Sequence, residues 1–130
     1  MREIRIGWAG ASITPDRPVV MVGQMYHRVS EYVRDPLTAT ALALDNGETQ
    51  AVFVSLDMVE PPYWLKERLD QLLAGVEGLD PRYVSLGVTH THSSSDFNSD
   101  FLRDANEKIL GTDILPPVEM GPEVLRGEEA

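Results

Sequence analysis

Residues 38–57, TATALALDNGETQAVFVSLD, decide the fold because they predict two strands joined by a tight turn. The residues on both sides of Asp45-Asn46-Gly47 are apolar and often β-branched, over about 38–44 and again over about 50–57. Asparagine and glycine tolerate the left-handed backbone conformations that hairpin turns require. The stretch therefore predicts an antiparallel hairpin.

The residues after this hairpin predict a helix and then a further strand. Apolar residues recur at three- and four-residue spacing over about 62–76, which is the period of an amphipathic helix. They are Leu65, Leu69, Leu72, Leu73 and Val76. An apolar run over about 83–89 then predicts a strand that leads into two histidines. Strand 50–57, this helix and strand 83–89 form a βαβ unit, whose two strands are expected to be parallel.

The N-terminal residues predict one more strand. Ile4, Ile6 and Trp8 alternate with other residues over about 3–10, which is the two-residue period of a strand with one buried face. Together with the hairpin and the βαβ unit, this strand predicts an α/β fold with a mixed sheet. Residues 11–36 contain three prolines and show no sustained period, so they predict a long structured loop, a kind of segment that often carries function.

We expect one domain followed by a tail. Residues 1–110 have the length and composition of one α/β domain, and the apolar spacing from Phe101 to Leu110 predicts a short second helix near its end. Residues 111–130 combine prolines, glycines and glutamates with little periodicity. Such a composition predicts an extended or disordered acidic tail.

Composition and charge exclude several classes of partner. The net charge of −10 disfavours binding to nucleic acid or to an anionic membrane surface, because neither attracts an acidic chain. The chain has no cysteine, so any metal site must use oxygen and imidazole ligands. No apolar run reaches the roughly 18 residues of a membrane helix, and no signal peptide is visible. We therefore expect a cytoplasmic protein, or a secreted one if an upstream leader is missing.

Residues 89–93, THTHS, place two of the three histidines two residues apart at the end of the last predicted strand. In an extended chain such side chains share a face and lie about 6.5 Å apart, so His90 and His92 can both approach one metal ion. Asp57 ends the neighbouring strand, and Asp96 follows the histidines, so each is a candidate additional ligand. Zinc or a similar ion held here would activate a bound water for hydrolysis.

Each of these residues also has a structural interpretation. His90 and His92 can be polar residues at a strand end, because two histidines fall short of the three or four protein ligands of a typical zinc site. Asp57 can cap the helix that follows, and Asp96 can be a turn residue. His27 has no neighbours at ligand spacing and is interpreted as an ordinary surface histidine.

Several short motifs occur in an order that resembles one family. They are Gly7-Trp8-Ala9 through Ile13-Thr14-Pro15, Met21 to Tyr26, Asp35-Pro36-Leu37, Asn46-Gly47, Val52 to Asp57, and Thr89 to Ser93. This order is similar to the N-terminal part of the neutral/alkaline non-lysosomal ceramidases, zinc-dependent amidases that cleave the N-acyl bond of ceramide. The resemblance covers about residues 5–97. Ser93-Ser94-Ser95-Asp96 replaces the family's Ser-Gly-Pro turn and Thr40 replaces a basic residue, which implies a distant bacterial-type homologue.

The resemblance implies a role for each histidine of the motif. The first histidine is a zinc ligand in the family and corresponds to His90, while the second lies near the oxyanion and corresponds to His92. The family's other ligands, a His, a Glu and a Tyr, and its catalytic serine come from later motifs that this sequence does not contain. The resemblance therefore implies a fragment of a zinc-dependent amidohydrolase of sphingolipid metabolism, weakly active or inactive alone, whose substrate is a small-molecule or lipid-like amide.

Two other functions remain open. The metallo-β-lactamase superfamily also places T-H-x-H at a strand end, but Ser94 and Ser95 stand where its second metal's ligands are expected. Alternatively, the chain is a non-enzymatic binding or interaction module on the same scaffold, because a fold does not establish an activity. If the chain is truncated, its sheet is expected to expose an unpaired edge that favours self-association.

Overall fold

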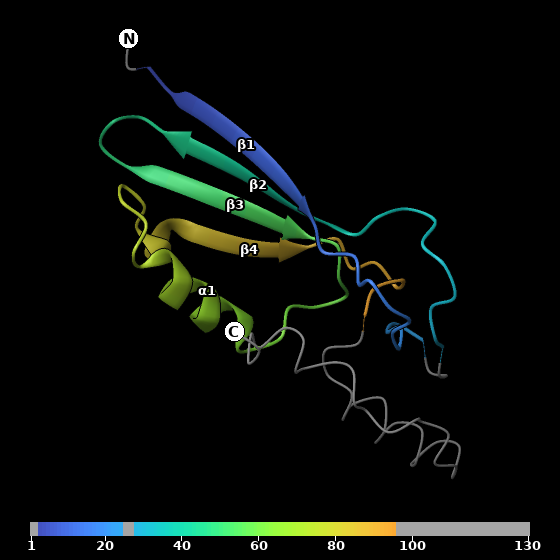
Figure 1. Cartoon of the computed structure of the whole chain (residues 1–130). Helices are drawn as coiled ribbons and strands as arrows, with labels where there is room; N and C mark the ends of the chain where they lie inside the picture. Colours follow the sequence, from blue (N-terminus) through green and yellow to red (C-terminus); the bar gives the residue numbers. More distant parts are fainter. Residues whose placement is uncertain (1–2, 25–27, 96–130) are drawn as a thin grey trace.

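A computed structural model of the chain describes residues 3–24 and 28–95, which form a four-stranded sheet with one α-helix (Figure 1). The elements are β1 (Arg5–Ser12), β2 (Thr38–Asp45), β3 (Gln50–Leu56), α1 (Leu65–Leu73), the short 3-10 helix η1 (Pro81–Tyr83) and β4 (Val84–Val88). The strands lie in the order β1-β2-β3-β4. The first two pairs are antiparallel and β3 pairs with β4 in parallel. The predicted α/β fold with a mixed sheet is therefore confirmed.

The predicted helix over 62–76 is three residues too long at each end. Pro61 and Pro62 lie before α1, and the backbone N–H of Leu65 donates to the carbonyl of Pro62 (3.0 Å) in a tight turn. At the other end, Val76 N–H donates to the carbonyl of Leu73 (2.9 Å), three residues back, so the α-helical pattern has already stopped. No helix within the described residues is long and apolar enough to cross a membrane.

The hairpin turn between β2 and β3 uses the residues that the sequence predicts. The side-chain oxygen of Asn46 accepts hydrogen bonds from the backbone N–H groups of Glu48 (2.9 Å) and Thr49 (2.8 Å). Gly47 has a φ of +83°, in the left-handed region that glycine adopts without steric cost. Asp45 and Gln50 close the paired strands on either side of this turn.

The two faces of the sheet differ in exposure. On one face lie Leu56 and Val84, which are two of the three buried hydrophobic residues in the described part of the chain. Helix α1 lies along the β3–β4 side of the sheet (Figure 1), and Lys66 near its start donates to the carbonyl of Pro81 in η1 (3.4 Å). Apolar side chains of β3 and β4 alternate with more exposed ones, so α1 covers the face that carries Leu56 and Val84.

The opposite face of the sheet is open and carries a row of apolar side chains. Trp8 pairs with Leu42, and Leu42 pairs with Phe53, so these three residues lie side by side across β1, β2 and β3. Their exposed fractions are 79%, 40% and 52%. We call this surface the open face. The remaining strand residues on it are Ile6, Gly10, Ser12, Thr38, Thr40, Leu44, Ala51, Ser55, Ser85 and Gly87, and none of them is charged.

The loops that follow β1, β3 and β4 gather at one end of the sheet (Figure 1). Isolated bridges join Val20 to Val29 and Met21 to Ser95, so the described part of the loop between β1 and β2 lies against the segment after β4. This end is the carboxyl end of β3 and β4, where open α/β sheets build their sites.

The carboxylate of Asp57 joins three strand ends at this edge. One of its oxygens accepts hydrogen bonds from the backbone N–H and the hydroxyl of Thr38, both at 2.8 Å, and the other accepts from the Thr89 hydroxyl at 3.1 Å. These bonds, led by the Thr38 N–H, hold the pKa of Asp57 below its ordinary value. The interpretation of Asp57 as a helix cap is wrong, because α1 begins after Trp64, which makes no side-chain capping bond.

The lowered pKa of Asp57 predicts how stability depends on pH. A carboxyl whose pKa is depressed by folding stabilises the fold above its unfolded-state pKa of about 3.9, and this contribution is lost as the pH falls through the folded-state pKa. Replacing Thr38 with Val keeps the shape and the backbone donor but removes the hydroxyl. We expect Thr38→Val to unfold with about 1 kcal/mol less free energy near pH 7 and to lose stability less steeply on acidification.

Urea unfolding at several values between about pH 7 and about pH 3 measures this difference. Thr40→Val is the matched control, because Thr40 lies two residues along β2 with an exposed side chain on the same face. If the free energy of unfolding of Thr38→Val falls with decreasing pH as steeply as that of wild type, the role assigned to the Asp57 carboxylate is contradicted.

Candidate functional site

The two histidines come together through a turn and not through a continuing strand. β4 ends at Val88, and His90 has a φ of 58°, in a left-handed conformation that is uncommon for residues other than glycine. The extended backbone expected through residue 90 is therefore absent. The rings of His90 and His92 nevertheless lie edge to face, with centroids 5.2 Å apart and an interplanar angle of 69°.

The ring of His90 is oriented by a backbone carbonyl. Its Nδ1 lies 2.7 Å from the carbonyl oxygen of Val59, in the loop that follows β3. Because a carbonyl oxygen only accepts, this hydrogen bond assigns the proton to Nδ1 and leaves the lone pair of Nε2 available in the neutral ring. Histidines that bind metals commonly hold their other ring nitrogen in this way. The hydrogen bond thus fixes the ring of His90 and leaves its Nε2 able to accept a further bond.

Val22 and Arg28, in the loop between β1 and β2, hold the backbone of the segment after β4. The guanidinium of Arg28 donates from Nη2 to the carbonyl of His92 and to that of Val22 (2.9 Å). The N–H of Val22 donates to the carbonyl of Ser94 (3.1 Å). His92 is itself exposed, so these contacts fix its backbone while its ring remains accessible to solvent.

The other candidate ligands predicted from the sequence do not complete a metal site in the described part of the chain. Asp57 lies at the same end of the sheet, but its carboxylate accepts hydrogen bonds from Thr38 and from Thr89, the neighbour of His90. Asp96 and His27 lie outside the described residues.

Within the described residues, no three or more His, Cys, Asp or Glu side chains gather where they could hold a metal ion. A zinc ion usually takes three or four protein ligands. The imidazole of His90 therefore suits one position around such an ion, and His92 lies close enough to assist, but the described residues do not supply a full set.

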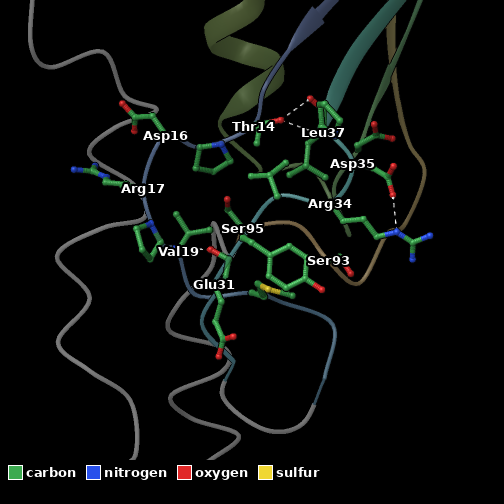
Figure 2. A pocket seen from close by; sticks show the side chains of 18 of the residues that line it. Thr14, Asp16, Arg17, Val19, Glu31, Arg34, Asp35, Leu37, Ser93 and Ser95 are labelled. Atoms are coloured by element: carbon green, nitrogen blue, oxygen red, sulfur yellow. Dashed lines mark hydrogen bonds and ion pairs between the residues drawn. The ribbon is translucent and has the colours of Figure 1, made fainter.

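A groove of about 840 Å³ lies beside the segment that carries the histidines. Figure 2 shows its walls, which come from the loop between β1 and β2 and from Ser93 and Ser95 after β4. Thr91 and Asp57 also line it, whereas His90 and His92 do not. Alternate residues of this segment thus face the groove, and the two imidazole rings form a separate feature.

Residues from distant parts of the chain orient the histidines of this site, and sequence patterns did not identify these residues. Val59 contributes only its backbone carbonyl, so its side chain gives no signal. Arg28 and His92 are 64 residues apart, and Thr38 and Asp57 are 19 apart, so no periodicity links either pair. Gly23 is the exception, since a glycine within a structured loop does suggest a backbone that other residues rarely adopt.

Comparisons with known proteins give one informative likeness. No protein-family model matches the chain, and no curated protein matches it. A solved structure described as a ceramidase complexed with C2 matches with a TM-score of 0.63 and 24% sequence identity. The match covers 72% of this chain and 16% of the ceramidase chain. This chain therefore shares its fold with one portion of a ceramidase.

Proposed function

We propose that this chain is part of a zinc-dependent hydrolase that cleaves an amide (N-acyl) bond, as the ceramidase name of its structural neighbour suggests. The observation that carries the proposal is the hydrogen bond from His90 Nδ1 to the Val59 carbonyl, which leaves Nε2 free to bind a metal. The shared fold and the order of the sequence motifs add support. The substrate class is a small-molecule or lipid-like amide.

The residues of this chain would have distinct roles in such a reaction. His90 would hold the zinc ion, which when bound polarises the substrate carbonyl or activates the attacking group. The ring centroid of His92 lies 5.2 Å from that of His90. His92 would donate a hydrogen bond to the substrate oxygen that becomes negative as the carbonyl carbon becomes tetrahedral. Asp57 would act indirectly, because through Thr89 it fixes the start of the histidine segment. Since the described residues offer no third ligand, further ligands would come from another part of the complete protein.

Zinc binding tests the role of His90. We expect the chain to bind one zinc ion per molecule, and we expect His90→Ala to weaken binding at least about tenfold, since it removes the oriented ligand. His92→Ala should weaken binding less. Calorimetric titration with a zinc salt measures both, and His27→Ala is the control because it removes the remaining histidine of the chain. Titration curves that are indistinguishable between wild type and His90→Ala would favour a purely structural histidine.

The incomplete ligand set of the described residues predicts that the chain is a poor catalyst by itself. A zinc ion bound by His90 without a full set of protein ligands is not held in the geometry that directs it toward a substrate. We expect little or no release of fatty acid from a fluorescent N-acyl amide when zinc and the purified chain are mixed, at a rate equal to that with His90→Ala. Strong, zinc-dependent turnover that His90→Ala abolishes would show that the chain completes the site.

A second candidate function is that of an interaction module, and the open face favours it. A row of exposed apolar side chains, Trp8, Leu42 and Phe53, is unusual on a surface that faces only water. The open face bears no charged strand residue, so two copies can stack face to face without opposing like charges, although the chain has a net charge of −10. The fitting partner is therefore a second copy of the chain, stacked with its open face against this one.

Self-association would depend on Trp8 in this case. We expect wild type to dimerise with increasing concentration and Trp8→Lys to weaken dimerisation at least about tenfold, because it places a charge in the apolar row. Sedimentation equilibrium over a range of concentrations measures this. Tyr63→Lys is the control, since Tyr63 is 95% exposed and lies before α1, outside the open face. A wild-type chain that stays monomeric throughout would contradict this function.

A further inference from the structure

The ring of His92 is seated against a glycine that has room for no other residue. Gly23 has a φ of +100°, a conformation that side-chain-bearing residues rarely adopt. A Cβ atom built on Gly23 would lie under 3.0 Å from Cγ, Cβ and Nδ1 of His92. Gly23 is thus required both by its own backbone and by the closeness of the imidazole.

Arg28 fixes the same contact from the backbone side. Its Nη2 donates to the carbonyl of Val22, directly before Gly23, and to the carbonyl of His92. One guanidinium nitrogen therefore ties together the two segments whose close approach depends on the glycine. A planar guanidinium has its donors in a fixed arrangement, whereas the single ammonium of lysine lies on a flexible stem.

These contacts constrain the ring that lies beside His90. The centroid separation of 5.2 Å between the two rings is set by the position of the His92 backbone and by its side-chain rotamer. A methyl group at position 23 would push the ring out of its seat, and loss of the Arg28 bonds would release the backbone. Either change alters the geometry at His92 without touching His92 itself.

We propose that Gly23 and Arg28 are positioning residues that hold the His92 imidazole beside His90. The glycine provides the space in which the ring lies, and the arginine holds the His92 backbone against Val22. The value of this arrangement for hydrolysis rests on the proposed function, whereas the positioning itself is a property of the folded chain.

Gly23→Ala and Gly47→Ala form a matched pair that tests the proposal. Both glycines have positive φ, +100° and +83°, so both alanine variants adopt an unfavourable backbone. Only Gly23 faces the His92 ring, since nothing lies within 4 Å of a Cβ at Gly47. We expect Gly23→Ala to lower the folding equilibrium constant at least about tenfold more than Gly47→Ala, measured by urea unfolding. NMR of the histidine ring nitrogens should show His92 signals shifted in Gly23→Ala and unchanged in Gly47→Ala.

The variant His92→Gly shows whether the His92 side chain itself causes the difference. His92→Gly removes all three atoms that a methyl group at position 23 would meet, including Cβ, so adding Gly23→Ala in that background should cost no more than adding Gly47→Ala. This comparison keeps the proposal testable if Gly23→Ala alone fails to fold, because the double variant should regain folding. A cost of Gly23→Ala that is the same with and without the His92 side chain would overturn the role of Gly23.

Arg28→Lys tests the second half of the proposal. Lysine keeps the positive charge, so a shift of the His92 ring signals would follow from loss of the guanidinium geometry and not from the loss of charge. Arg34→Lys is the control, because Arg34 lies in the same loop with a highly exposed side chain. Unchanged His92 signals in Arg28→Lys would overturn the role of Arg28. None of these readouts uses zinc or turnover, so a wild-type chain that failed to bind zinc would contradict the proposed function alone.

Discussion

The hydrogen bonds of the Asp57 carboxylate are the constraint on which the candidate site depends. Asp57 follows β3, and its two oxygens bind the first residue of β2 and the residue after β4. Three strands thus end in a fixed relation to one another. Thr89 is one of the residues held, and His90 comes next, so the position from which the histidine segment departs is set by this carboxylate. A carboxylate that accepts three hydrogen bonds holds its partners firmly, because hydrogen bonds to a charged group are stronger than those between neutral groups.

The left-handed backbone at His90 follows from what the surrounding contacts demand. A non-glycine residue in this conformation costs of the order of 1 kcal/mol and persists only where its neighbours determine it. Here Thr89 is fixed on one side by Asp57, and the His92 carbonyl is fixed on the other by Arg28. Only His90 and Thr91 lie between these anchors, and the hydrogen bond to the Val59 carbonyl offsets part of the cost at His90. Strain of this kind is concentrated at functional sites, which agrees with the role proposed for His90.

Much of the fold could be predicted from the sequence because its signals are local. The hairpin follows from Asn46-Gly47 between two apolar runs, and the parallel pairing of β3 with β4 follows from the helical period between them. The predicted ends of α1 were less accurate, because a tight turn that begins at Pro62 leads into the helix and another that begins at Leu73 follows it. The second helix predicted after residue 100 lies outside the described residues.

The candidate site could be predicted only in part, for a different physical reason. The spacing of His90 and His92 predicted that their rings lie close together, which the structure shows, yet the assumption of an extended strand gave the wrong backbone, since His90 has a left-handed φ. The residues that orient the histidines act across long stretches of chain. Val59 acts through its backbone carbonyl, which every residue has, and Arg28 also binds backbone carbonyls. Contacts made to backbone atoms leave no trace in residue type, so only the folded chain reveals them.

The two candidate functions place their demands on different parts of the molecule. A hydrolase needs the strand ends, where His90 is oriented and the groove opens. An interaction module needs the open face, on which Trp8 lies in the middle of the edge strand β1. Substitutions at well-separated sites without shared partners act independently. The apolar row on the open face is also compatible with a hydrolase. Helix α1 covers only the other face of the sheet, and in the proposed hydrolase a second layer of secondary structure would pack on the open face. An exposed Trp8 therefore does not decide between the two functions, and the metal affinity of His90 does.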